Sequence, residues 1–161
     1  MGQMGVPLLE PVAVLGYDVV MLHPISVRFR EPSIVERLKT EAAARDRSTS
    51  ALAEELIDEG LRMRRHPLVV FGDGESGRRA ALVGGPDVWE VVAGVIGGDI
   101  PVSERVERAV EVLGLRRHQV EAALRYYVEY TEEIDAAIEA NHASAEEAET
   151  MWRRQQHLLA R

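Results

Sequence analysis

A short segment near the N-terminus has the residue types that could bind DNA. In residues 25–30 the apolar side chains of Ile25, Val27 and Phe29 alternate with polar ones. This is the period of a β-strand with two different faces. Arginine can donate to guanine, and serine can donate or accept at base edges in the major groove, which a two-stranded ribbon fits. The polar side chains that we expect to contact bases are Ser26, Arg28 and Arg30.

The turn at residues 47–50 has a composition suited to binding phosphate. Ser48 is a good helix N-cap, because its side-chain oxygen can accept a hydrogen bond from a free backbone N–H group. The neighbouring hydroxyls and the unpaired N–H groups of the first helical turn can donate to a phosphate oxygen. The residues expected to contact the DNA backbone are Arg47, Ser48, Thr49 and Ser50.

Two amphipathic helices are expected to position these groups. Pro32 ends the strand and can occupy the first turn of a helix, and the apolar spacing that follows predicts a helix over residues 33–44. A second apolar stripe predicts a helix over residues 48–64, which Pro67 prevents from continuing. A lone strand cannot stand alone in water. We therefore expect the strands of two copies to pair antiparallel about a two-fold axis, with their apolar faces beneath four helices.

This strand–helix–helix segment resembles the ribbon-helix-helix family of bacterial repressors and antitoxins. The resemblance covers about forty residues and rests on Ile25-Ser26-Val27-Arg28-Phe29, Pro32, Arg47-Ser48-Thr49-Ser50 and the apolar helix of residues 52–61. It implies an intertwined homodimer that binds operator DNA through the outward strand residues, with Ser48 capping the helix that grips phosphate. Asp46 stands where the family commonly has glycine, and aspartate tolerates a left-handed backbone conformation.

Residues 68–85 predict a β-hairpin rather than a nucleotide-binding loop. Gly72, Gly74 and Gly77 follow an apolar strand with the spacing of a dinucleotide fingerprint. That fingerprint requires a helix directly after it, whose N-terminus holds the pyrophosphate. Residues 78–83 are too few for such a helix and are typical of a return strand. We therefore interpret the glycines as the turn of a hairpin.

The remainder of the chain is expected to be helical. Asp87 can cap one helix, Ser103 can cap a second that Gly114 ends, and a third begins at residue 116 or 117, with a break near Thr131. The two helices around Gly114 have helix-turn-helix spacing. A second DNA contact there stays open beside the alternative of an ordinary solvated helix start.

Residues 66–141 resemble a small family that follows ribbon-helix-helix domains in actinobacterial antitoxins. The matching strings lie at residues 66–67, 69–71, 77–83, 85–90, 120–130 and 133–135. The last of them resembles a domain of unknown function encoded beside PIN-like ribonucleases. The resemblance implies an antitoxin of a type II toxin–antitoxin system, which neutralises a PIN-like ribonuclease toxin and represses its own operon.

The C-terminal segment carries candidate anchors for that ribonuclease. Trp152, Arg153 and Arg154 follow an acidic helical stretch, and tryptophan and arginine are favoured anchors of protein interfaces. PIN-type nucleases hold magnesium with clustered carboxylates, which an arginine can engage as a charge partner. We therefore expect residues 131–161 to wrap the partner. The alternative is a helix packed on its own domain.

Composition excludes several classes of protein. The chain has 161 residues, of which 46% are hydrophobic and 29% charged, so a folded core is expected. It has no cysteine, which excludes disulfide scaffolds and thiolate sites, and its five histidines lack metal-ligand spacing. We expect no enzyme activity, no metal and no cofactor.

Charge and hydropathy bear on partners and location. The net charge of −8 argues against indiscriminate nucleic-acid binding. No apolar run reaches the roughly 18 residues that a membrane helix needs, and no basic segment precedes the apolar stretch near the N-terminus. We therefore expect a cytoplasmic protein without membrane contact.

These expectations combine into one organisation. The fold class is mainly α with short β: a loosely ordered leader at residues 1–20, a ribbon-helix-helix dimerisation domain at 21–65, a β-hairpin with a helix-turn-helix-like helical domain at 66–141, and a helical tail at 142–161. One alternative function is a stand-alone ribbon-helix-helix repressor whose C-terminal domain oligomerises or senses a ligand. Another is a scaffold without DNA, in which the N-terminal strand joins a sheet with the leader or the hairpin.

Overall fold

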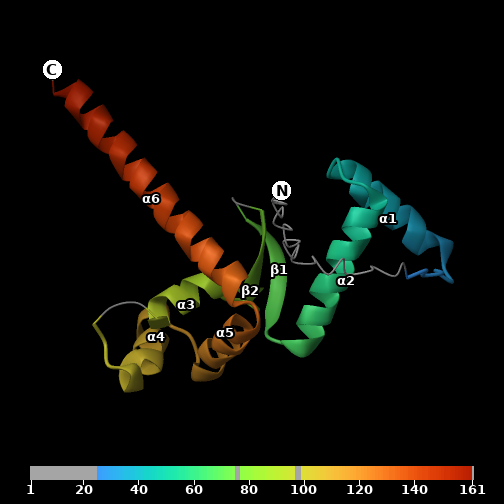
Figure 1. Ribbon diagram of the computed structural model, residues 1–161, viewed down its shortest axis with the longest axis horizontal. Coiled ribbons are helices and arrows are strands. Elements are labelled where there is room, and N and C mark those ends of the chain that lie inside the picture. Colours follow the sequence, from blue (N-terminus) through green and yellow to red (C-terminus); the bar gives the residue numbers. More distant parts are fainter. Residues whose placement is uncertain (1–24, 75–76, 97–98, 161) are drawn as a thin grey trace, which may run out of the picture.

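The computed structural model describes residues 25–74, 77–96 and 99–160. Within these residues the chain is mainly helical, with six α-helices, one short 3₁₀ helix and one two-stranded antiparallel sheet. Figure 1 shows the first two helices on one side of the central hairpin and the other helices on its opposite side. The leader expected at residues 1–20, and the first four residues of the domain expected at 21–65, lie outside the described residues.

The two N-terminal helices are α1 (Pro32–Ala44) and α2 (Thr49–Arg65), which pack against each other. Both predictions are confirmed to within one residue at each end. The chain turns between them at Asp46, whose φ of 51° is the left-handed conformation that aspartate tolerates. The N–H group of Arg47 closes the turn by donating to the carbonyl oxygen of Ala42 at 2.9 Å.

The hairpin is also confirmed. It consists of β1 (Val69–Gly74) and β2 (Gly77–Leu82), with Val69 opposite Leu82 and Gly74 opposite Gly77. Gly77 has a φ of 105°, which a residue with a side chain rarely adopts. Because a strand and not a helix follows Gly77, the glycine spacing does not form a dinucleotide-binding loop.

The C-terminal part contains α3 (Val88–Ile96), the 3₁₀ helix η1 (Val102–Glu104), α4 (Arg105–Leu113), α5 (Arg117–Glu129) and α6 (Thr131–Leu159). Gly114 ends α4 in the left-handed conformation, and the break expected near Thr131 is confirmed. The expectation for Ser103 was wrong, because Ser103 lies within η1 and α4 follows from Glu104 without a side-chain cap. The boundary expected at residue 142 falls inside α6, which is continuous.

The hydrophobic core lies in the C-terminal part, around α3. This helix contacts α4, α5, α6 and β2, and its valines pack against the inner faces of α5 and the hairpin. The side chains with the least exposure include Val69, Leu82, Val88, Val91, Val92, Val120 and Tyr126. In contrast, the buried apolar residues of α1 and α2 are only Ala42 and Leu52 among the described positions. The N-terminal helix pair therefore has almost no core of its own.

A polar junction joins the end of α2 to α5 and α6. The Arg62 guanidinium lies 4.2 Å from the ring centre of Tyr130, and it donates to the hydroxyl of Tyr126 at 3.0 Å and to Glu133 at 2.5 Å. Burial alone lowers the pKa of Arg62, but the hydrogen bonds to Glu133 and Tyr126 raise it overall. Burial raises the pKa of Tyr126, whose hydroxyl in turn donates to Glu133. These contacts join α2 to α5 and α6.

A second ion pair fastens α2 to the hairpin. Arg78 on β2 donates through two nitrogens to Glu59 of α2, at 2.5 and 2.8 Å, and also to Asp73 of β1 at 3.1 Å. The hydrogen bond to Glu59 raises the pKa of Arg78. Glu59 is buried, and Arg78 is the ion-pair partner that a carboxylate in this position needs. The two junctions together fix the C-terminal half of α2 to the rest of the chain.

We predict that Arg62→Ala lowers the free energy of unfolding by about 2 kcal/mol, because the Tyr126 hydroxyl and Glu133 lose their donor and the Tyr130 ring loses its cation. Urea denaturation followed by circular dichroism measures this. The matched control is Arg64→Ala, an exposed arginine two residues away on the same helix, for which we expect a change within about 0.5 kcal/mol. Equal effects of the two variants would contradict the junction.

Candidate nucleic-acid interface

Residues 25–30 run extended on the surface without forming a strand. The exposed fractions of Ile25, Val27 and Phe29 are 88%, 58% and 44%. Their backbone makes no hydrogen bond to another described segment of the chain. A strand requires a hydrogen-bonded neighbour, and among the described residues of a single chain none is in reach. The strand expected here is therefore absent from the isolated chain.

The apolar side chains of this segment line a groove on α1 and α2. The groove has a volume of about 670 Å³ and is open to solvent. Its apolar lining includes Val27, Phe29, Ile34, Leu38, Leu56 and Ile57. The stripe of α2 that the sequence indicated is therefore only partly covered, since Leu52 is buried but Leu61 is among the exposed apolar residues. The groove is an open apolar surface beside a segment whose backbone has no hydrogen-bonded neighbour among the described residues.

The polar side chains of residues 25–30 are free for contacts outside the chain. Ser26, Arg28 and Arg30 are exposed and make no hydrogen bond or ion pair with any described residue. Nothing in the described chain therefore competes with a base or a phosphate for these side chains. The geometry leaves them available for such contacts.

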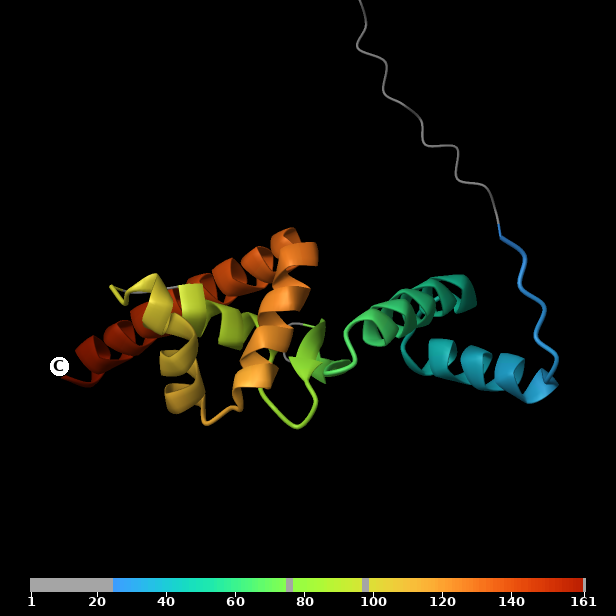
Figure 2. The ribbon, with the colours of Figure 1, turned by 90° about the horizontal axis from the view of Figure 1, so that it is seen from below.

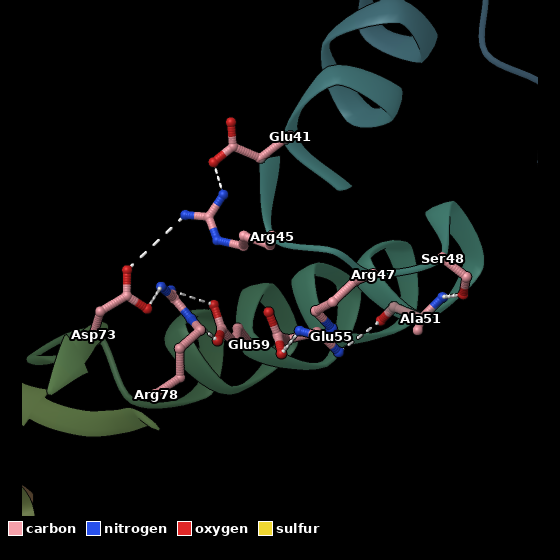
Figure 3. Close-up of polar contacts among 9 residues, drawn as sticks. All are labelled: Glu41, Arg45, Arg47, Ser48, Ala51, Glu55, Glu59, Asp73 and Arg78. Carbon is pink, nitrogen blue, oxygen red and sulfur yellow. Dashed lines mark hydrogen bonds and ion pairs between the residues drawn. The ribbon is translucent and has the colours of Figure 1, made fainter. Parts of the chain in front are cut away.

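The start of α2 has the cap that the sequence predicted. The Ser48 hydroxyl accepts the N–H hydrogen bond of Ala51 at 3.1 Å, and Thr49 and Ser50 are exposed beside it. Figure 3 shows that Arg47 is engaged within its own chain, because it pairs with Glu55 and points to the carbonyl oxygen of Ala51 at 3.5 Å. Arg47 must leave Glu55 before it can bind phosphate. No hydrogen bond or ion pair joins this turn to Ser26, Arg28 or Arg30 within one chain's described residues.

The helix pair around Gly114 offers less to DNA. Arg117 forms ion pairs with Glu107 of α4 and, at 3.8 Å, with Glu121 of α5. The backbone N–H group of Arg116 donates to the side-chain oxygen of Gln119 at 3.0 Å. These contacts are those of a helix start neutralised by nearby carboxylates, which favours the alternative of an ordinary solvated helix start.

The second half of α6 is a free helix. Every residue from 139 to 160 is exposed, including Met151, Leu158 and Trp152, whose exposed fraction is 59%. Figure 1 shows this half projecting away from the helices that form the core. Arg153 makes an ion pair with Glu149, one turn earlier, at 2.6 Å. The alternative of a helix packed on its own domain is wrong for these residues.

The junction residues are those that the sequence reasoning missed. Arg62, Glu133 and Tyr126 are far apart in the sequence, and no spacing rule joins them. Arg62 is only partly buried, and no feature of the sequence pairs it with residues of α5 and α6. Among residues 25–74, 77–96 and 99–160 no group of three histidine, aspartate or glutamate side chains could hold a metal ion. No helix within the same described ranges is long and apolar enough to span a bilayer.

No family model matches the chain, and no curated protein or solved structure is found to be similar.

We predict that Ser48→Ala lowers the free energy of unfolding by about 1 kcal/mol, because the Ala51 N–H group loses its acceptor at the start of α2. Thermal or urea unfolding of the purified protein measures it. Ser50→Ala is the matched control, since Ser50 is exposed and its hydroxyl has no described partner. A loss as large in Ser50→Ala would show that the cap is not the source of the effect.

Proposed function

We propose that the chain is a DNA-binding homodimer of the ribbon-helix-helix type and that it represses its own operon. The observation that carries the proposal is the exposed, unpaired segment of residues 25–30 beside an open apolar groove. Within the described part of the chain, the backbone of residues 25–30 lacks hydrogen-bond partners, and the adjoining groove on α1 and α2 lacks apolar side chains to cover it. A second copy of the same chain supplies both needs at once.

Pairing of two copies through residues 25–30 lowers the free energy of the folded chains. Antiparallel pairing of two 25–30 segments gives every second backbone group a partner across the two-fold axis. It also covers Val27 and Phe29 together with the exposed apolar residues of α2, Leu56 and Ile57. Full burial of each such side chain contributes about 1.5–3 kcal/mol. The free energy gained by burying several such side chains offsets the cost of association, whereas burial of a single residue would not.

The paired segments present a face suited to the major groove. Ser26, Arg28 and Arg30 lie on the side of the alternation opposite to the apolar residues, so the symmetric pair presents two sets of them. The capped N-terminus of α2, with Ser48, offers N–H groups to a phosphate. We assign base contacts to the strand residues and backbone contacts to residues 47–50, where Arg47 must exchange Glu55 for the phosphate.

The second part of the proposal is an antitoxin role in the cytoplasm. The resemblance of residues 66–141 implies a PIN-like ribonuclease as partner. The free half of α6 supports this part, since Trp152, Arg153 and Arg154 lie in residues 139–160, all of which are exposed. Both roles are binding, with no bond made or broken by this protein.

We predict that Arg28→Ala weakens binding to the chain's own promoter by about 1–3 kcal/mol for each of two symmetric contacts. Fluorescence anisotropy with a promoter duplex at fixed salt measures the dissociation constant. Arg64→Ala is the matched control and should bind as the unaltered protein does. Affinity should fall steeply with salt in the unaltered protein. No promoter binding by the intact chain at low salt would favour the scaffold without DNA.

For the antitoxin role, we predict that deleting residues 143–161 abolishes inhibition of the ribonuclease encoded beside this chain and leaves promoter binding in place. The deleted segment contains the proposed anchors, and each of its described residues, 143–160, is exposed. Cleavage of a model RNA by the purified ribonuclease, with and without each form of the chain, measures inhibition. Full inhibition by the truncated chain would contradict the role of α6, and the absence of a neighbouring ribonuclease gene would favour the stand-alone repressor.

A further inference from the structure

The free half of α6 needs a partner for its stability. Residues 139–160 extend for several turns beyond the last contact with the core, as Figures 1 and 2 show. Most of the stability of a helix in a protein comes from packing one face. Met151, Trp152 and Leu158 are exposed on this half. The pattern of its side chains indicates which partner fits.

Three apolar side chains of this half, Ala148, Met151 and Leu158, fall on a seam of heptad spacing whose other positions are polar. Counting every third and fourth residue from Asn141 defines a seam, and the side chains along it are Asn141, Ser144, Ala148, Met151, Gln155 and Leu158. One flank of the seam carries Ala145, Trp152 and Leu159, and the other carries Glu147 and Arg154. A stripe of this width is that of a helix packed against one other helix.

The two flanks complement themselves when the second helix runs antiparallel. In the register that places Met151 opposite Ala148 of the other copy, Glu147 faces Arg154 across one flank. On the other flank the large Trp152 faces the small Ala145. Each match occurs twice by symmetry. A parallel pair would instead place Trp152 opposite Glu147 and would leave Glu147 without an arginine.

The ion pairs within one helix agree with this arrangement. Arg153 and Glu149 pair with each other on the outer face, away from the seam. Arg154 and Glu147 have no hydrogen bond or ion pair to any described residue. Glu147 and Arg154, which face each other in the proposed antiparallel register, are therefore without a partner among the described residues of their own chain.

We propose that α6 of one chain pairs antiparallel with α6 of a second copy, through residues 141–158. This pairing is a second self-interface, at the opposite end of the chain from residues 25–30, and it does not rest on the proposed DNA contacts. Two different self-interfaces on one chain join dimers into a tetramer or a longer assembly. The pair also covers Trp152 and Arg154, so a ribonuclease bound to these residues and a second α6 exclude each other.

Charge reversal in the full-length chain tests the register. The background is Phe29→Glu, which removes association through residues 25–30, and sedimentation equilibrium then measures the remaining self-association. We expect a dimer that Glu147→Arg or Arg154→Glu weakens at least about tenfold, because each change creates two like-charge pairs. The double variant Glu147→Arg/Arg154→Glu restores the opposite charges and should regain the dimer. The control Glu146→Arg changes charge on the outer face and should leave the association constant unchanged.

Cross-linking tests the direction of the helices. The chain has no cysteine, so Ala148→Cys and Met151→Cys each introduce one thiol. A co-expressed mixture of the two variants should form a disulfide between copies, and each variant alone should form much less. A Phe29→Glu chain that stays monomeric at high concentration, a double charge variant that associates no better than the single ones, or efficient cross-linking of Ala148→Cys with itself would overturn the proposal. Promoter binding by the chain with an intact residue 29 is a separate readout, so the two proposals can fail independently.

Discussion

The folding of the N-terminal part is constrained by the absence of a core within one chain. Of the apolar side chains in α1 and α2, only Ala42 and Leu52 are buried, while the residues of the α2 stripe beyond Leu52 remain largely in water. A helix pair with so little buried area gains too little from the hydrophobic effect to offset its conformational entropy. The exposed segment at residues 25–30 lacks backbone hydrogen bonds to other described residues in the same way that the helix pair lacks buried apolar area. Its completion by a second copy is the simplest way to remove both deficits.

The junctions make the two ends of the chain mechanically dependent on each other. Arg62 and Glu59 lie on the same helix that bears Ser48 at its start, and they are paired with Glu133 of α6 and Arg78 of the hairpin. Because these are charge-assisted hydrogen bonds of partly buried groups, the end of α2 cannot rotate freely against α6. The orientation of the α1–α2 unit is therefore tied to the direction in which α6 leaves the core. A partner bound to α1 and α2 and a partner bound to α6 therefore bind to elements that the junctions hold together.

Local sequence patterns determined most of the elements, and long-range contacts explain what they missed. Both N-terminal helices, the hairpin, the Ser48 cap and the stop at Gly114 follow from spacing and turn chemistry within a few residues. The prediction that Ser103 caps a helix was wrong because residues 102–104 form a 3₁₀ turn after Pro101. Local sequence allows both the cap and the turn, and only packing decides between them. The continuity of α6 was missed because the polar stretch after residue 141 resembles a boundary. The Arg62 junction joins residues more than sixty positions apart, which no local pattern can reveal. The DNA and ribonuclease contacts stay predictions.

The placement of charge makes DNA binding by this acidic chain physically consistent. The net charge is −8, and seven of the 27 acidic residues lie in α6, whose 29 residues extend about 44 Å. The field of an exposed charge is screened over about 8 Å at physiological salt. The acidic half of α6 leaves the core on the side of the hairpin opposite to α1 and α2 (Figure 2). Residues 25–30, which carry two arginines and no acid, therefore act outside the reach of those carboxylates. The carboxylates that repel a phosphate backbone near this segment are those of Glu31, Glu36 and Glu41, and the two symmetric pairs of arginine contacts must offset that repulsion.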